Sequence, residues 1–216
     1  MVNKAWTKKY SPKIYTEQLL PAKSGIRSLV KEIFDGTYDT YKGILLYGKG
    51  GTGKTTFAKT LANHTGWDVY ELEESGETKK SLDTIKTVIS TIPYNHKGDQ
   101  FGGSKHLIVG NEISESSLSF RNGLRAIIDK SVDTFFVFTD NNYDKLLSEN
   151  PQVFGDERIL CLCWNDLIDT EILGMCERIL KSEGKYSAPN MVIASTLIKR
   201  HYPSVRQIIE KLQENT

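Results

Sequence analysis

The sequence predicts an α/β protein in which a parallel sheet is covered by helices on both faces and is followed by a small helical domain. First, a glycine-rich loop at 48–55 lies between an apolar run and a helix-forming segment. Second, strand-like and helix-like segments alternate along residues 43–164, which is typical of parallel sheets. Third, only helical periodicity remains from residue 166 onward.

The 216 residues are enough for one sizeable core with a small appendage. A formal charge of +1 means that any nucleic-acid contact must come from a local basic patch. No segment approaches the roughly 20 continuous apolar residues of a membrane span, and the N-terminus lacks the apolar middle of a signal peptide. We therefore expect a soluble intracellular protein that makes no membrane contact.

The first segment, residues 4–25, contains two prolines and little periodicity, so we expect an extended arm that ends in a turn. Trp6, Tyr10, Leu19 and Leu20 would be costly to leave in water, which favours a packed arm over a disordered tail.

The elements of the sheet domain follow from apolar spacing and from cap and breaker residues. A helix over 24–35 is expected behind a Ser24 cap. After the loop we expect a helix over 55–64, a strand over 67–72, a helix over 81–89, a strand over 105–109, a helix over 117–129, and strands over 134–139 and 159–164. The segments 94–104 and 145–158 are expected to be irregular.

Three further helices, over 167–181, 191–202 and 204–213, would form a lid packed on the first domain. The expected domains are therefore residues 1–164 and residues 165–216.

The loop Gly48-x-x-x-x-Gly53-Lys54-Thr55 has the residues that hold a triphosphate. Its glycines let backbone N–H groups turn towards phosphate oxygens, and the following helix adds the positive end of its dipole. Lys54 would reach the outer phosphates, and the Thr55 hydroxyl would take a place on Mg²⁺. The predicted phosphate-binding residues are Gly51, Thr52, Gly53, Lys54, Thr55 and Thr56.

Hydrolysis usually requires two adjacent acids at the end of a hydrophobic strand. Here the pair is Asn111 and Glu112, and Glu112 is the candidate for polarising the attacking water. Asn111 can offer a carbonyl oxygen to a Mg²⁺-bound water but lacks the negative charge, so we expect slower turnover. Asn141 follows the next strand and should lie beside the phosphate loop, within reach of the terminal phosphate and the water.

Two arginines are candidates for stabilising the negative charge of the transition state. Arg158 precedes the last strand and could project into the nucleotide of a neighbouring subunit. Arg206 opens the final helix, so a closing lid would bring it to the phosphates. Taken alone, each is equally compatible with a solvated surface charge.

Together these residues resemble an AAA+ clamp-loader ATPase of the P-loop NTPase class, closest to the small subunit of T-even-type bacteriophages and more distantly to replication factor C. The motifs that carry the resemblance are Lys9-Tyr10-Ser11-Pro12, Leu19-Leu20-Pro21-Ala22, Gly48 to Thr55, Thr139-Asp140-Asn141-Asn142 and Ser204-Val205-Arg206-Gln207. They are similar to the family's adenine-lining arm, the segment after it, the phosphate loop and the two sensors. The sensor motif of the family reads Thr-Ala-Asn-Asn.

The resemblance implies that Lys8, Lys9, Tyr10 and Leu19 line the adenine of ATP. It places Arg158 as the trans-acting finger, although Glu157-Arg158-Ile159 stands where the family has Ser-Arg-Cys. The family continues into a helical collar, and the printed sequence ends where that collar would begin.

The activity implied is ATP-driven loading of a sliding clamp onto primer-template DNA, with Mg²⁺, in the cytoplasm of a bacterial host cell during viral replication. The implied partners are the clamp, the large subunit of the loader, other copies of this chain, and DNA contacted by Lys79, Lys80 and Arg121. Two alternatives stay open: a nucleotide-sensing module that hydrolyses little, suggested by Asn111, and another DNA-associated AAA+ ATPase such as a helicase loader.

Overall fold

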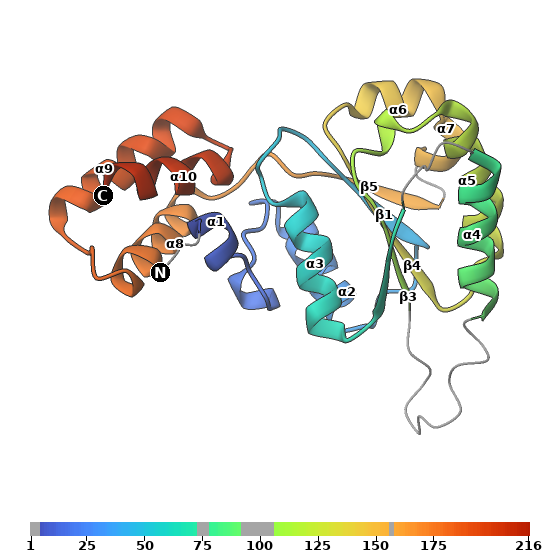
Figure 1. Cartoon of the computed structure of the whole chain (residues 1–216), viewed down its shortest axis with the longest axis horizontal. Helices are drawn as coiled ribbons and strands as arrows, with labels where there is room; N and C mark the ends of the chain where they lie inside the picture. The colour runs from blue at the N-terminus through green and yellow to red at the C-terminus, as the bar shows by residue number, and fades with distance from the viewer. Residues whose placement is uncertain (1–4, 73–77, 92–105, 156–157) are drawn as a thin grey trace.

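The computed structural model describes residues 5–72, 78–91, 106–155 and 158–216. Figure 1 shows a sheet domain beside a group of C-terminal helices. Within the described residues the sheet has five parallel strands in the order β2-β3-β4-β1-β5. The strands are β1 (Gly43–Tyr47), β2 (Asp68–Glu71), β3 (His106–Gly110), β4 (Thr134–Asp140) and β5 (Ile159–Cys163). The predicted α/β fold with a parallel sheet is confirmed.

Helices cover both faces of the sheet, and successive strand residues point to opposite faces. In β1, Ile44 and Leu46 pack in the cluster that contains Phe57, whereas Leu45 packs in the cluster that contains Phe120. The first cluster lies under α2 (Ser24–Phe34) and α3 (Lys54–Thr65). The second lies under α4 (Thr78–Thr91), α5 (Leu118–Lys130) and α7 (Pro151–Phe154). Burial on both faces explains the continuous apolar runs of β1, β3 and β4, whereas β2 at the edge of the sheet is exposed.

Two local predictions for the sheet domain are wrong. Ser24 is the first residue of α2 and not its cap, since Lys23 occupies the cap position without a side-chain hydrogen bond. The segment expected to be irregular contains α6 (Tyr143–Glu149) and α7. The Asn142 side chain caps α6, and Pro151 stands at the start of α7, where a missing N–H costs nothing. The expected loop over 94–104 lies outside the described residues.

The N-terminal arm is not uniformly extended, because it contains the short helix α1 (Trp6–Lys9) and the 3₁₀ turn η1 (Tyr15–Glu17). Its apolar side chains do not pack on the sheet alone: Trp6 and Leu19 belong to the core of the C-terminal helices, with Ile208. The backbone N–H of Trp6 donates a hydrogen bond to Gln213 Oε1 at 2.9 Å. The arm therefore joins the two parts, and the domain boundary at residue 164 stays a prediction.

The C-terminal helices are α8 (Asp169–Ser182), α9 (Ala188–His201) and α10 (Val205–Asn215). Helix α9 starts three residues earlier than expected, because Ser187 caps it by accepting from the Asn190 N–H. Pro189, expected between helices, lies in the first turn, where proline is tolerated. Among the described residues, no helix combines the length and the apolar character needed to cross a membrane.

Arg121, expected at the DNA, is 2% exposed and lies inside the sheet domain. Its guanidinium donates to Asn150 Oδ1 at 2.7 Å and to the Ser114 carbonyl at 3.0 Å, and it pairs with Glu149. That prediction is wrong, because the Arg121 guanidinium is buried and its hydrogen bonds go to acceptors of its own chain, so it is not available to DNA. The side chains of Lys79 and Lys80 are outside the described part of the chain.

Replacing Arg121 by alanine should therefore act on folding. We expect Arg121→Ala to lower the free energy of unfolding by about 3 kcal/mol, since it leaves buried acceptors without their donor. The exposed Arg125 on the same helix provides the matched control. Arg125→Ala should change the free energy of unfolding by less than about 0.5 kcal/mol. Urea denaturation followed by circular dichroism measures both. Equal effects of the two substitutions would contradict the structural role of Arg121.

Candidate functional site

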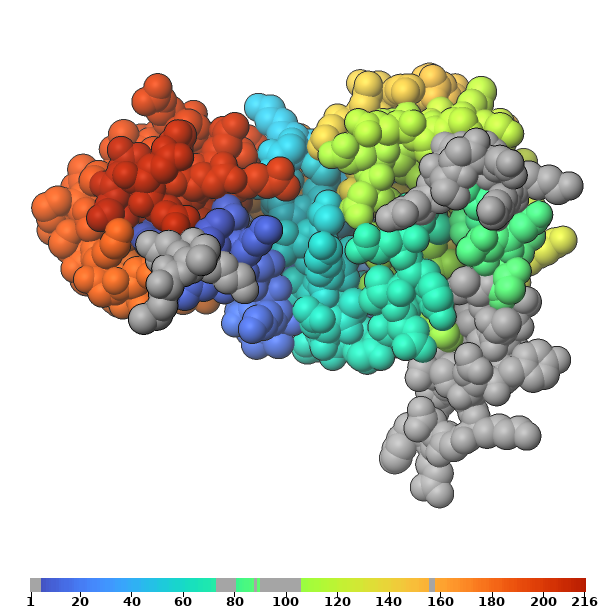
Figure 2. Space-filling model, in the orientation of Figure 1, coloured from blue at the N-terminus to red at the C-terminus, as the bar shows by residue number. Residues whose placement is uncertain are grey.

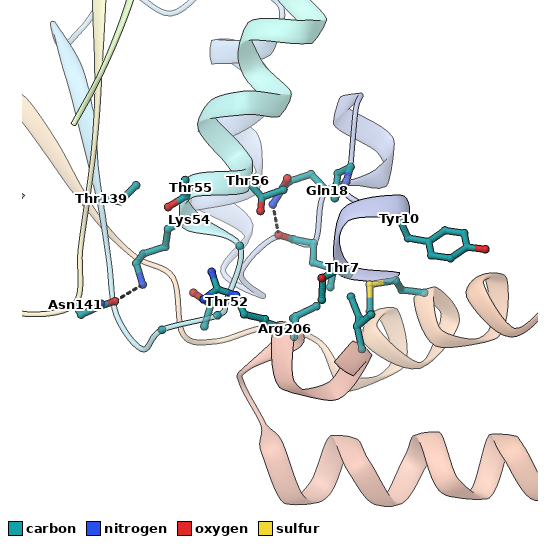
Figure 3. A pocket seen from close by; sticks show the side chains of 18 of the residues that line it. Thr7, Tyr10, Gln18, Thr52, Lys54, Thr55, Thr56, Thr139, Asn141 and Arg206 are labelled. Atoms are coloured by element: carbon teal, nitrogen blue, oxygen red, sulfur yellow. Dashed lines mark hydrogen bonds between the residues drawn. The ribbon is translucent and has the colours of Figure 1, made fainter. Parts of the chain in front are cut away.

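A pocket lies where the phosphate loop, the N-terminal arm and the lid helices meet (Figure 3). Figure 2 shows the arm, α3 and the lid helices close together on this face of the molecule. The predicted site residues that line the pocket are Tyr10, Leu19, Gly51, Thr52, Gly53, Lys54, Thr55, Thr56, Glu112, Asn141 and Arg206. Residues from five separate segments are thus brought together.

Lys54 is the first residue of α3, directly after Gly53, which has a φ of 99°. Its ammonium group donates to the carbonyl oxygens of Gly48 and Lys49, both at 2.8 Å, and to Asn141 Oδ1 at 2.9 Å. Burial lowers the pKa of Lys54, while the charges of Asp140 and Glu112 oppose that shift. The lysine therefore links the loop to the carboxyl end of β4, as expected for a parallel sheet.

Asn111 and Glu112 follow β3 on the neighbouring strand. The Glu112 backbone is left-handed, with a φ of 48°, and its N–H donates to Thr139 Oγ1 at 3.3 Å. The Thr139 hydroxyl in turn donates to Asn111 Oδ1 at 3.3 Å. Glu112 and Thr139 line the pocket, whereas Asn111 is not among the lining residues. Thr139 is thus the side chain that ties the ends of β3 and β4 together.

The protein oxygens near the phosphate loop fit a magnesium ion that is held mainly by the phosphates of a bound nucleotide. Mg²⁺ prefers oxygen ligands and usually keeps one or two protein groups beside phosphate oxygens and waters. Thr55 lines the pocket at the start of α3, and the Asn111 amide oxygen accepts a hydrogen bond from Thr139, which also lines the pocket. Both assignments as metal-site residues stay predictions.

The far wall of the pocket is formed by residues that sequence reasoning missed. They are Thr7, Pro12 and Gln18 from the arm and Met175, Val205 and Ile209 from the lid. The apolar members have the helical spacing of ordinary core residues, so no local signal marks them. Only the packing of the arm against the lid brings them to one surface, which is suited to a flat apolar group.

Lys8 and Lys9, predicted beside the adenine, do not line this pocket. The Lys9 ammonium pairs with Glu183 Oε1 at 2.6 Å, and the Tyr10 hydroxyl donates to the same oxygen at 2.6 Å. Burial, followed by the Glu183 hydrogen bond, raises the pKa of Tyr10. The carboxylate of Glu183 therefore connects the arm to the end of α8.

The start of α10 contacts the phosphate loop directly. The backbone N–H of Arg206 donates to the Gly51 carbonyl at 3.1 Å. A Cβ at Gly51 would lie 2.4 Å from Ser204 Oγ, and the φ of Gly51 is 79°. The loop is also held by the segment after β5, because the backbone N–H of Lys49 donates to Asn165 Oδ1 at 2.6 Å. These contacts position the Arg206 side chain in the pocket.

Arg158 lies elsewhere, immediately before β5. All strands are parallel, so the start of β5 is at the edge of the sheet opposite the phosphate loop. Its guanidinium pairs with Asp129 and donates to the Gln152 carbonyl at 3.2 Å. The structure does not bring Arg158 to the pocket of its own chain.

Comparisons with known proteins agree with this architecture. The sequence profile of the family described as "ATPase family associated with various cellular activities (AAA)" matches residues 44–160. Replication factor C large subunits from Thermococcus kodakarensis and Picrophilus torridus are each 25% identical over 217 and 247 residues, which cover 99% and 97% of this chain. The chain spans 40% and 55% of the length of these two curated relatives.

Two solved structures of RuvB variants from Thermotoga maritima are similar in fold. Their TM-scores are 0.65 and 0.67, at 15% and 13% sequence identity. The alignments cover 94% and 95% of this chain and 64% and 65% of the RuvB chains. At this identity the likeness concerns the fold alone.

Two glycines allow a matched test of the contact between the loop and α10. Gly51→Ala forces a left-handed alanine against Ser204, so we expect it to separate the lid from the loop and to weaken ATP binding by about tenfold or more. A Cβ at Gly25, in α2 and outside the pocket, meets no heavy atom within 4 Å, so Gly25→Ala should leave the affinity within about twofold. Titration with a fluorescent ATP analogue measures both. Equal affinities for the two variants would contradict the importance of this contact.

Proposed function

Since the chain belongs to the family of ATPases associated with various cellular activities, we propose that it is an ATP-hydrolysing subunit of a sliding-clamp loader. The observation that carries the ATPase part is the convergence of Lys54, Glu112, Asn141 and Arg206 on one pocket. The similarity to replication factor C subunits, which extends over nearly the whole chain, supports the clamp-loading part.

In the proposed reaction the loop amides and Lys54 bind the phosphates, and the apolar wall formed by arm and lid takes the adenine. Glu112 orients the attacking water and accepts its proton, while Asn141 and Arg206 hold the terminal phosphate. Bound Mg²⁺, held through Thr55 and the phosphates, would neutralise charge on the phosphate oxygens.

Arg158 completes this site from a neighbouring subunit. The pocket and Arg158 lie at opposite edges of one sheet, so a single chain cannot supply both to the same nucleotide. A head-to-tail arrangement of copies brings the Arg158 of one subunit to the ATP of the next. The proposed partners are accordingly other copies, a large subunit, the sliding clamp and primer-template DNA.

The motifs of the arm, loop and sensors support a small subunit of the bacteriophage type that acts in the cytoplasm of a bacterial host. The curated relatives named above are archaeal large subunits. Mass measurement of the complex assembled with ATP distinguishes the two roles, because a small subunit is present in several copies and a large subunit in one.

The ATPase rate should rise when primed DNA, the clamp and the partner subunit are added together. Arg158→Ala should lower this stimulated rate by a factor on the order of 10³, while ATP affinity stays within about twofold. Lys130→Ala removes an exposed positive charge near Arg158 and should leave the rate unchanged. Steady-state phosphate release measures each rate. Absence of stimulation by any combination of partners would contradict clamp loading.

A second function, nucleotide sensing with little hydrolysis, is favoured by one observation: an uncharged Asn111 that bonds to Thr139. In the assembled complex, Asn111→Asp should raise the single-turnover rate of ATP hydrolysis about tenfold, since it restores the charge that holds Mg²⁺. Asn63→Asp adds the same charge on the exposed side of α3 and should have no effect. A native rate at background that Asn111→Asp restores supports the sensing module; a native rate well above background supports the motor.

A further inference from the structure

Asp140, the last residue of β4, is a buried carboxylate to which the proposed reaction assigns no part. Its side chain is 1% exposed, and it does not line the pocket. It lies between Thr139 and Asn141, both of which do line the pocket. A buried carboxylate is costly unless hydrogen bonds compensate for the lost water, so its partners indicate its purpose.

The partners of Asp140 belong to three different parts of the site. Its Oδ2 accepts from the Ser114 N–H at 2.6 Å, and its Oδ1 accepts from the Asn142 N–H at 2.6 Å. Its backbone carbonyl accepts from the Gly48 N–H at 3.2 Å. Ser114 is two residues after Glu112, Asn142 is next to Asn141, and Gly48 opens the phosphate loop.

The bond to Ser114 acts on a strained position. Glu112 has left-handed backbone geometry, which persists only when its surroundings fix it. The Thr139 hydroxyl holds the Glu112 N–H on one side, and the Asp140 carboxylate holds the N–H of Ser114 on the other. Two consecutive residues of β4 thus fix both sides of Glu112.

The same carboxylate shapes the turn that presents Asn141. An aspartate oxygen that accepts from the N–H two residues later closes a tight turn, and here this N–H belongs to Asn142. Asn141 is the central residue of that turn, and its amide oxygen bonds to Lys54. The opposite side of Ser114 is held by cations, since its carbonyl accepts from Arg121 at 3.0 Å and from Lys145 at 2.9 Å.

We propose that Asp140 is a positioning residue for ATP hydrolysis, whose carboxylate holds Glu112 and Asn141 in one fixed relation to the phosphate loop. This inference rests on the proposed ATPase function. Charge-assisted hydrogen bonds to backbone N–H groups are short and directional, so the carboxylate sets the distance between the two side chains. Small displacements of reacting groups reduce rates far more than they reduce binding.

Asp140→Asn tests the role, because the amide keeps the shape but offers one acceptor oxygen for two N–H donors. In the complex assembled with primed DNA, the clamp and the partner subunit, we expect the single-turnover hydrolysis rate of bound ATP to fall on the order of tenfold to a hundredfold. ATP affinity should stay within about threefold, because the binding groups of the loop remain. Asp144→Asn makes the same chemical change at an exposed site four residues on and should alter neither quantity.

Thermal unfolding shows whether each variant folds, and Asp140→Ala replaces Asp140→Asn if the amide destabilises the fold, since alanine places no donor against the two N–H groups. An unchanged rate in a folded variant overturns the proposal. A parallel loss of affinity and rate also overturns it, because in a folded variant that pattern indicates a general disturbance of the ATP site. A native rate at background in the assembled complex contradicts the proposed ATPase function instead.

Discussion

The buried ammonium of Lys54 is the interaction on which the site depends. A charge with so little exposure needs acceptors in place of water, and the chain supplies two loop carbonyls and the Asn141 amide oxygen. These bonds fix the loop to the end of β4, which in turn is bonded to the end of β3 through Thr139. Phosphate oxygens are anionic hydrogen-bond acceptors. In the proposed function, the phosphates of ATP therefore compete for the Lys54 ammonium with the two loop carbonyls and the Asn141 amide oxygen.

Residues with a local signal could be predicted from the sequence, and those defined by packing could not. The phosphate loop, Glu112 and Asn141 follow from the order of strand and loop, because parallel strands bring their carboxyl ends to one edge. Arg121 has the sequence character of a surface cation, and only its contacts with Asn150 and Glu149 show that it is buried. Short helices such as α7 are too short to show apolar periodicity, so the pattern could not reveal them.

The N-terminal arm shows the same limit at larger scale. Trp6 and Leu19 indicate that the arm is packed, but nothing in their neighbourhood indicates the lid as their partner. Once the arm is placed there, Gln18 and Met175 come to one wall of the pocket although 157 positions separate them in the chain. Most of the missed residues of the site are therefore contributed by long-range contacts between arm and lid, although Thr139, at the end of β4, was also missed.

This arrangement gives nucleotide binding a mechanical consequence. The pocket has one wall from the sheet domain and one from the arm and lid, which share a hydrophobic cluster. A ligand that contacts both walls favours the closed arrangement, in which the two walls are nearest to each other. The size of this shift is set by the difference between the ligand's affinities for the closed and the open forms. In the proposed head-to-tail arrangement, Arg158 sits at the far edge of the sheet, so a change in the angle between lid and sheet would also change how one copy meets the next. Under that proposal, the state of the nucleotide would control assembly through contacts already present within one chain.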